Sequence, residues 1–140
     1  KNDNCFVEQK NFKCIRDYVG YRRFDTPAEL KALATVYAAL CPLLNYFLPS
    51  VKLIDKRRVG ARVRKVYDKP LSPCQRLLAS PDLTGEVKAE LARRCQRYNP
   101  VLLQREVHRA VDALMELSRR KDLIRQRSLA AAALENSELG

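Results

Sequence analysis

The sequence predicts a mainly α-helical chain with a strongly basic surface. Three observations lead to this expectation. Apolar side chains recur in steps of three and four over most of the 140 residues. A residue that can cap a helix stands before proline where such stretches begin, at Thr26-Pro27, Ser72-Pro73 and Asn99-Pro100. Lys and Arg total 27 against 16 Asp and Glu, a net charge of +11 that favours an anionic partner such as nucleic acid.

The first helix is predicted over residues 3–19. Asn2, Asp3 or Asn4 can cap its start, and Gly20 is suited to ending it. A carboxylate, Glu8, falls in the same stripe as the apolar or small residues Cys5, Phe12, Ile15 and Val19.

A second helix is predicted from Thr26-Pro27-Ala28-Glu29, which has the pattern of a capping box with proline at the first helical position. Because Pro42 lacks a backbone donor, we expect a kink or break near Leu40. The predicted buried stripe consists of Leu30, Leu33, Tyr37, Leu40, Leu44 and Phe47.

The helical period disappears between Pro49 and Asp68, where basic residues surround several valines. We expect an extended arm or loose hairpin that turns at Gly60, followed by a short helix from Ser72-Pro73 to about Ala79. The basic residues of this region are Lys52, Lys56, Arg57, Arg58, Arg62, Arg64, Lys65 and, just beyond, Lys69.

Two more helices are predicted to form a hairpin over residues 81–118. Thr84 can cap the first, which reaches Arg97 and carries Val87, Leu91 and Cys95 inward, with Glu90 placed to pair with Arg94. After Asn99-Pro100, the second has the stripe Leu103, Val107, Ala110, Leu114 and Leu117. Residues 119–140 are expected to form a frayed helix and then a basic, disordered tail.

Periodicity alone allows two interpretations of Glu8. If its stripe packs against another surface, an unpaired carboxylate there lowers the stability of the fold by several kcal/mol, unless it contacts a metal ion, a basic partner or a water-filled cleft. Alternatively, Glu8 is exposed in the first turns of the helix, where the macrodipole favours a negative charge.

The segment Asn2-Asp3-Asn4-Cys5-Phe6-Val7-Glu8-Gln9-Lys10-Asn11 resembles the region around the last acidic residue of DDE-type, retroviral-integrase-like bacterial transposases. The similarity covers roughly residues 1–80. It continues through Arg16, Val19-Gly20-Tyr21, Arg23-Phe24-Asp25, Asn45, Phe47, Pro49, Lys52-Leu53, Tyr67-Asp68, Pro73 and Gln75-Arg76.

This resemblance implies that residues 1–48 end an RNase H-like catalytic core. Three carboxylates of such a core hold two divalent ions, Mg²⁺ or Mn²⁺, that cut and join DNA. Glu8 matches the third ligand, and the other two are expected upstream of Lys1, which stands where a complete chain would begin with Met. Asp3 does not replace one of them, since five residues rotate by about 140° on a helix. We therefore expect a fragment without catalytic activity that binds no metal by itself.

Many relatives carry a basic residue seven positions after the acidic one, to contact DNA. That position is Ile15 here, so the neighbouring cations Lys10, Lys13 and Arg16 are the predicted contacts. In the arm of residues 49–80, Lys52, Lys56, Arg57, Arg58, Arg62, Arg64 and Lys65 are expected to follow a DNA backbone, with Tyr46 and Tyr67 stacking on an unpaired base. The alternative is that the arm's valines pack and its charges are merely solvated.

The remaining features favour an intracellular protein, and the resemblance implies the bacterial cytoplasm, with association with the nucleoid when DNA is bound. The five cysteines form no CxxC pair, which favours a reducing compartment and small hydrophobic roles. The single histidine, His108, has no convincing catalytic or zinc-binding neighbours. No membrane contact is expected, and the full-length protein is predicted to form a homo-oligomer. A second hypothesis is a non-catalytic helical module for DNA binding or assembly.

Overall fold

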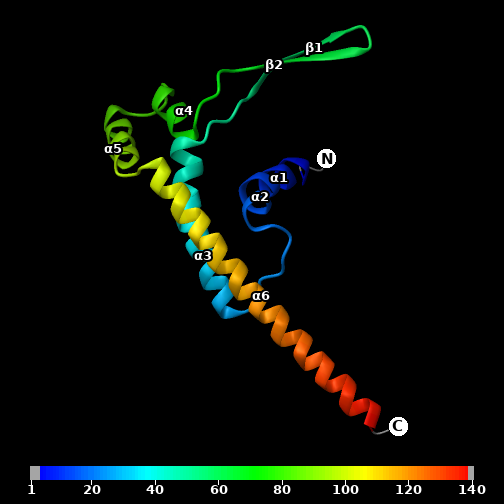
Figure 1. The fold of residues 1–140 in the computed structure, drawn as a ribbon. Coiled ribbons are helices and arrows are strands. Elements are labelled where there is room, and N and C mark those ends of the chain that lie inside the picture. The colour runs from blue at the N-terminus through cyan, green and yellow to red at the C-terminus, as the bar shows by residue number, and fades with distance from the viewer. Residues whose placement is uncertain (1–3, 139–140) are drawn as a thin grey trace. The chain divides into compact units, whose positions relative to one another are not determined.

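The computed structural model describes residues 4–138, and the side chains of residues 7–9 and 11–131. The chain divides into two compact units, Lys1–Tyr37 with Glu106–Gly140, and Ala38–Arg105. Helices dominate, and the described residues form a single sheet of two strands (Figure 1). The expectation of a mainly α-helical chain is therefore confirmed.

The first helical segment consists of α1 (Asn4–Asn11), a π-helical turn η1 (Phe12–Arg16) and α2 (Asp17–Val19). Gly20 ends it with a φ of 69°, a value that L side chains rarely adopt, so the predicted stop is confirmed. The predicted capping by Asn2, Asp3 or Asn4 lies outside the described side chains.

The second helix, α3 (Pro27–Pro42), begins with the predicted capping box. The Glu29 amide donates to Thr26 Oγ1 at 3.2 Å, and the Thr26 amide donates to Glu29 Oε2 at 3.0 Å. Of the predicted kink or break near Leu40, the break is wrong, because the chain stays helical through Pro42 and into a π-helical turn, η2 (Leu43–Phe47). The wider turn after Pro42 closes with a hydrogen bond from the Leu48 amide to the Leu43 carbonyl at 3.1 Å.

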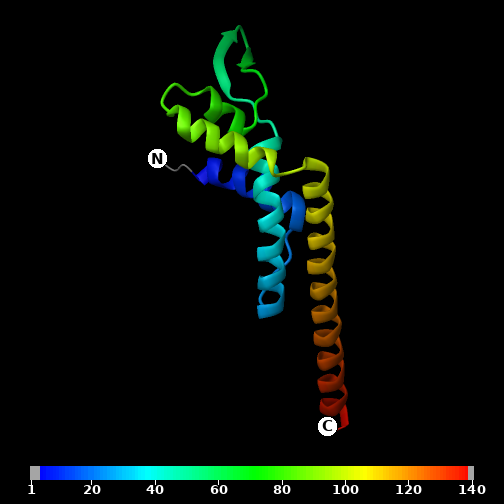
Figure 2. The same cartoon turned by 90° about the vertical axis from the view of Figure 1, so that its left-hand side faces the viewer.

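The buried face of α3 is rotated from the predicted one. Leu40 is buried as expected, but Leu30 is 54% exposed. In the first unit Val36 packs with Val19 and Leu114, and the first half of α3 runs beside α6 (Pro100–Glu138) in both views (Figures 1 and 2). The additional buried residues of α3 and η2 are Val36, Ala39 and Leu43.

Helix α6 starts where predicted, since Asn99 Oδ1 accepts hydrogen bonds from the amides of Val101 at 2.9 Å and Leu102 at 3.3 Å. Leu103, Val107 and Leu114 are buried, as the stripe predicted. The helix does not fray after residue 118; it continues to Glu138. The Ala130–Ala133 run and pairs such as Glu116 with Arg120 favour this extension.

In the second unit the basic arm forms an antiparallel hairpin of β1 (Leu53–Val59) and β2 (Arg62–Tyr67), and Gly60 in its turn has a φ of 62°. Next come α4 (Pro73–Ala79), capped by Ser72, and α5 (Gly85–Gln96), capped by Thr84. Helix α4 contacts η2 and α5.

The predicted inward face of α5 is only partly correct. Val87 is 50% exposed, whereas Leu91 and Cys95 are half-buried. The salt bridge from Arg94 Nε to Glu90 Oε1 forms at 2.9 Å, as expected. The deepest buried apolar residues of this unit lie elsewhere, at Leu40, Leu43, Cys74 and Leu103.

One described stretch, Pro27–Phe47, has the length and the apolar composition that a membrane-crossing helix needs. The sequence predicted no membrane contact. Core helices of soluble proteins meet the same criteria, and this stretch begins with the buried, ion-paired Glu29. The absence of membrane contact stays a prediction.

Candidate functional site

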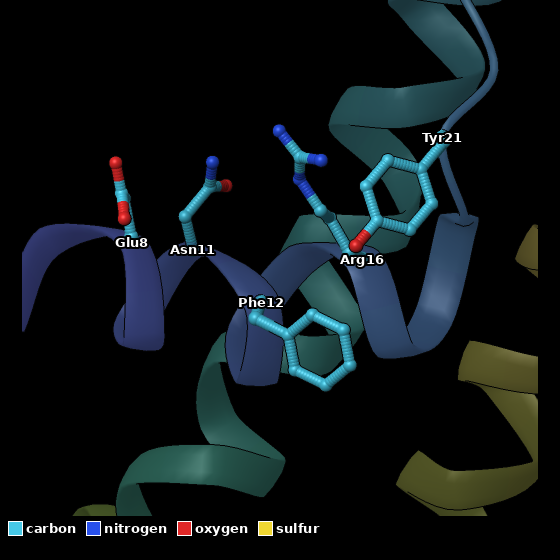
Figure 3. Close-up of a pocket in the computed structure, with 5 residues that line it drawn as sticks. All are labelled: Glu8, Asn11, Phe12, Arg16 and Tyr21. Carbon is cyan, nitrogen blue, oxygen red and sulfur yellow. The ribbon is translucent and has the colours of Figure 1, made fainter. Parts of the chain in front are cut away.

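An open pocket of about 360 Å³ lies along the first helical segment. Figure 3 shows the side chains of Glu8, Asn11 and Arg16 on the same side of this segment, with Tyr21 beside Arg16 and the Phe12 ring directed away from them. The pocket therefore brings together a carboxylate, an amide and a guanidinium group. These groups can bind a cation, donate to an anion and contact a phosphate, respectively.

The π-helical turn η1 decides which basic residue lies on the same face of the helix as Glu8. In a regular α-helix the seventh residue after Glu8, Ile15, would lie within about 20° of it, and the eighth, Arg16, would be about 80° away. A π turn closes its hydrogen bonds over one more residue than an α turn does. This extra residue moves Arg16 round to the face of Glu8, so both line the same pocket.

Tyr21 supports Arg16 in this position. The guanidinium carbon of Arg16 lies 4.3 Å from the centroid of the Tyr21 ring, a cation–π contact. The ring follows the sharp stop at Gly20, which turns the chain back towards Arg16. Sequence reasoning matched Tyr21 to the transposase pattern but gave it no role, and it gave none to Asn11.

Glu8 itself is exposed, which agrees with the second reading of the sequence. The predicted apolar stripe is buried only at its end, because Val19 is 3% exposed whereas Phe12 is 48% exposed and Ile15 is 36% exposed. A single carboxylate offers the oxygen ligand that Mg²⁺ prefers, but it does not make a site. Within the part of the chain that the structure describes, no three His, Cys, Asp or Glu side chains gather to hold a metal ion.

The other predicted contacts near Glu8 are less well placed. Lys13 is exposed but does not line the pocket, and the side chain of Lys10 lies outside the described residues. Among the predicted contacts whose side chains the structure describes, Arg16 lines the same pocket as Glu8 and Lys13 does not.

The predicted arm residues form one exposed basic hairpin. Lys56, Arg57 and Arg58 lie on β1, and Arg62, Arg64 and Lys65 lie on β2, all of them exposed. Lys52 precedes β1, where its amide donates to Asp68 Oδ1 at 2.6 Å. Asp55 forms a salt bridge with Arg57.

A clamp of Asp68 and Arg76 fixes the base of this hairpin. Arg76 Nη2 donates to Asp68 Oδ1 at 3.2 Å and to the Ser50 carbonyl at 2.6 Å, and its Nη1 bonds to Asp68 Oδ2. Bonding to Arg76 lowers the pKa of the Asp68 carboxyl, so Asp68 stays charged. Both clamp residues belong to the transposase-like pattern, but the sequence did not indicate that they join.

Replacing Arg76 with Met is expected to loosen the hairpin while leaving the helices intact. The substitution removes the bonds to Asp68 and Ser50, so that the base of the hairpin is held by the Ser50–Leu71 bridge and by the hydrogen bonds between Lys52 and Asp68. Trypsin should then cleave within residues 52–69 faster than in the unchanged chain. Arg93→Met, on exposed α5, serves as the control and should leave this rate unchanged. Equal protection in both variants would exclude the clamp.

The tyrosines predicted to stack on bases differ in availability. The Tyr46 ring stacks on Tyr98 at 5.5 Å and meets Phe47 edge-on at 6.3 Å, so neighbouring rings already contact it. Tyr67 is 49% exposed at the end of β2. Only Tyr67 fits the predicted stacking role. His108 is exposed on α6, in line with an ordinary surface residue.

Comparison with known proteins adds one relative. The chain is 43% identical over 76 residues to the uncharacterized protein y4rM of Sinorhizobium fredii. The matched segment is 54% of this chain and 22% of y4rM, so the chain spans about a fifth of that relative's length. No protein-family model and no solved structure matches the chain.

Proposed function

We propose that this chain is the C-terminal part of a DDE-type transposase or integrase, and that it binds DNA next to an active site which it completes with Glu8. The observation that carries the proposal is the shared pocket of Glu8 and Arg16 on the segment whose residues resemble the last acidic motif of these enzymes. An oxygen ligand for a metal and a cation for a phosphate are the groups that phosphodiester chemistry needs side by side.

The chain's placement in a larger enzyme is part of the same proposal. The first helical segment would be the last helix of an RNase H-like core, and two further carboxylates would come from residues that precede it. Mg²⁺ or Mn²⁺ bound by the three would activate the attacking oxygen and stabilise the leaving one. The match to a short part of the longer y4rM is compatible with such an arrangement. We further propose a homo-oligomer in the bacterial cytoplasm that acts on mobile-element ends and target DNA.

The reading frame that contains this chain provides the first test. An in-frame, strand-rich stretch upstream of Lys1 with two spaced Asp residues is expected. The encoded protein should cut and join mobile-element DNA only when Mg²⁺ or Mn²⁺ is added. A stop codon directly upstream would instead support the second candidate, a non-catalytic helical DNA-binding or assembly module, which the exposed basic hairpin favours independently of Glu8.

Substitutions of Arg16 and Tyr21 are expected to weaken DNA binding to different extents. Arg16→Gln should weaken duplex binding and reduce the salt slope by about one, since one phosphate contact is lost. Tyr21→Leu removes the cation–π contact, worth about 0.5–1 kcal/mol at an exposed site, and should weaken binding about two- to fivefold. Tyr21→Phe keeps the ring and should bind normally. Fluorescence anisotropy at several salt concentrations measures all three, and equal affinities for Tyr21→Leu and the unchanged chain would contradict the role of the ring.

A further inference from the structure

The β1–β2 hairpin carries positive charge on both of its faces. Directly opposed residues of an antiparallel pair lie on the same face. The pairs Arg57 with Arg64 and Val59 with Arg62 therefore share one face, and Lys56 with Lys65 and Arg58 with Val63 share the other. Each face thus has three cations.

Neither face of the hairpin is suited to packing on a protein core. A ribbon that covers a core usually has one apolar face and one polar face. Here the valines divide between the faces, with Val59 and Val66 on one and Val63 on the other, and they are 68%, 40% and 48% exposed. Figures 1 and 2 show the ribbon extending away from α4 and α5 of its own unit.

The hairpin also opposes its own folding electrostatically. Arg57 faces Arg64 and Lys56 faces Lys65 in adjacent rungs of the ladder, and like charges directly opposite one another destabilise a strand pair. Two-stranded hairpins are marginal in water even without this repulsion. The sequence from Leu53 to Tyr67 has six basic residues and one carboxylate, Asp55, to offset it. A polyanion that contacts both faces would relieve the repulsion.

We propose that the β1–β2 hairpin inserts into the major groove of duplex DNA, with each face against the phosphates of one groove wall, and becomes more stable on binding. The major groove, about 12 Å wide, admits a two-stranded ribbon. A flat anionic surface such as a membrane would meet only one face. The small Gly60-Ala61 turn allows the tip to enter first. The inference rests on the proposed DNA-binding function and specifies its geometry.

Two triple variants test the geometry, and each removes the three cations of one face of the hairpin. The first variant combines Arg57→Gln, Arg62→Gln and Arg64→Gln, and the second combines Lys56→Gln, Arg58→Gln and Lys65→Gln. The control removes the same charge from exposed positions of α6 with Arg109→Gln, Arg125→Gln and Arg127→Gln. Affinity of the intact chain for a 20-base-pair duplex is measured by anisotropy over a salt series, and circular dichroism checks that the helices persist.

The duplex affinity of both face variants should fall roughly tenfold or more, and their salt slope should decrease by about two to three. The control variant should show smaller changes in affinity and in salt slope. In the unchanged chain, bound duplex should be protected from dimethyl sulfate at guanine N7 in the major groove, and hairpin amides should exchange more slowly. Loss of binding from one face variant alone, or an unprotected major groove, would overturn groove insertion. So would preferential binding to phosphatidylserine vesicles over duplex.

The outcome is separable from that of the proposed enzyme activity. If the longer protein is a metal-dependent recombinase but neither face variant changes its duplex affinity, this inference is contradicted and the proposed function is not. If the hairpin binds the groove but Glu8→Gln leaves the activity of the longer protein unchanged, the proposed function is contradicted and this inference is not.

Discussion

Glu8→Gln in the longer protein is expected to reduce metal-dependent DNA joining by at least about 100-fold. The substitution keeps the size of the side chain and removes the negative charge that would help to hold two divalent ions. Residues that hydrogen-bond to a metal ligand without binding the metal already contribute about 10- to 100-fold to metal affinity or activity, so a direct ligand should contribute more. Joining of labelled mobile-element ends in Mg²⁺ and in Mn²⁺ is the measurement.

Two further measurements isolate the role of Glu8. Glu106→Gln neutralises another exposed carboxylate, on α6, and should leave joining intact. Duplex affinity of the Glu8→Gln protein, measured without metal, should be equal to or slightly greater than that of the unchanged protein, because a negative charge near the DNA is lost. Normal joining by the Glu8→Gln protein would exclude the proposed third ligand.

Glu29→Gln is expected to lower the free energy of unfolding by about 3 kcal/mol, the largest stability effect that we predict for one side chain. Glu29 is 1% exposed and lies between the start of α3 and Lys121 of α6, whose Nζ is 2.9 Å from Oε1 and 3.0 Å from Oε2. Its Oε2 also accepts from the amides of Asp25 and Thr26 and from the Thr26 hydroxyl. Breaking a buried ion pair by removing one partner leaves the other uncompensated.

Urea denaturation of single and double variants tests this pairing. Lys121→Met should also destabilise the chain, since it leaves a buried carboxylate without its cation. The double variant should lose less stability than the sum of the two single variants, as residues in direct contact do. Glu116→Gln breaks an exposed pair with Arg120 and should cost no more than about 0.5 kcal/mol. Additive losses at Glu29 and Lys121 would show that the two do not interact.

The same network predicts how stability depends on pH. Burial raises the pKa of Glu29, but the hydrogen bonds from Lys121, Thr26 and Asp25 outweigh it and lower that pKa from 4.5 to about 2. A group with a lowered folded-state pKa stabilises the fold above its unfolded value and loses this contribution as pH falls towards the folded one. The free energy of unfolding should therefore decline between about pH 5 and pH 2, and the decline should be shallower in Glu29→Gln.

Local sequence signals determined most of the secondary structure of this protein. Thr26-Pro27 with Glu29, Ser72-Pro73, Thr84 and Asn99-Pro100 each start a helix in the structure, since capping depends on groups within a few residues. The positive φ values of Gly20 and Gly60 likewise mark the stop of the first helical segment and the turn of the hairpin. The basic hairpin was also predictable, because charge and periodicity depend on the sequence alone, whereas the exposure of Glu8 was one of two alternatives that periodicity left open.

The tertiary structure decided which of these groups meet. The π turn at Phe12–Arg16 brings Arg16 to the face of Glu8, and no local signal in the sequence indicated that extra residue. Packing against Val19 and Leu114 selected Val36 for burial instead of Leu30. The ion pair of Glu29 with Lys121 joins residues 92 positions apart, and Asp68 meets Arg76 and the Ser50 carbonyl across the base of the hairpin. Periodicity describes one element at a time, so contacts between elements appear only once the chain has folded.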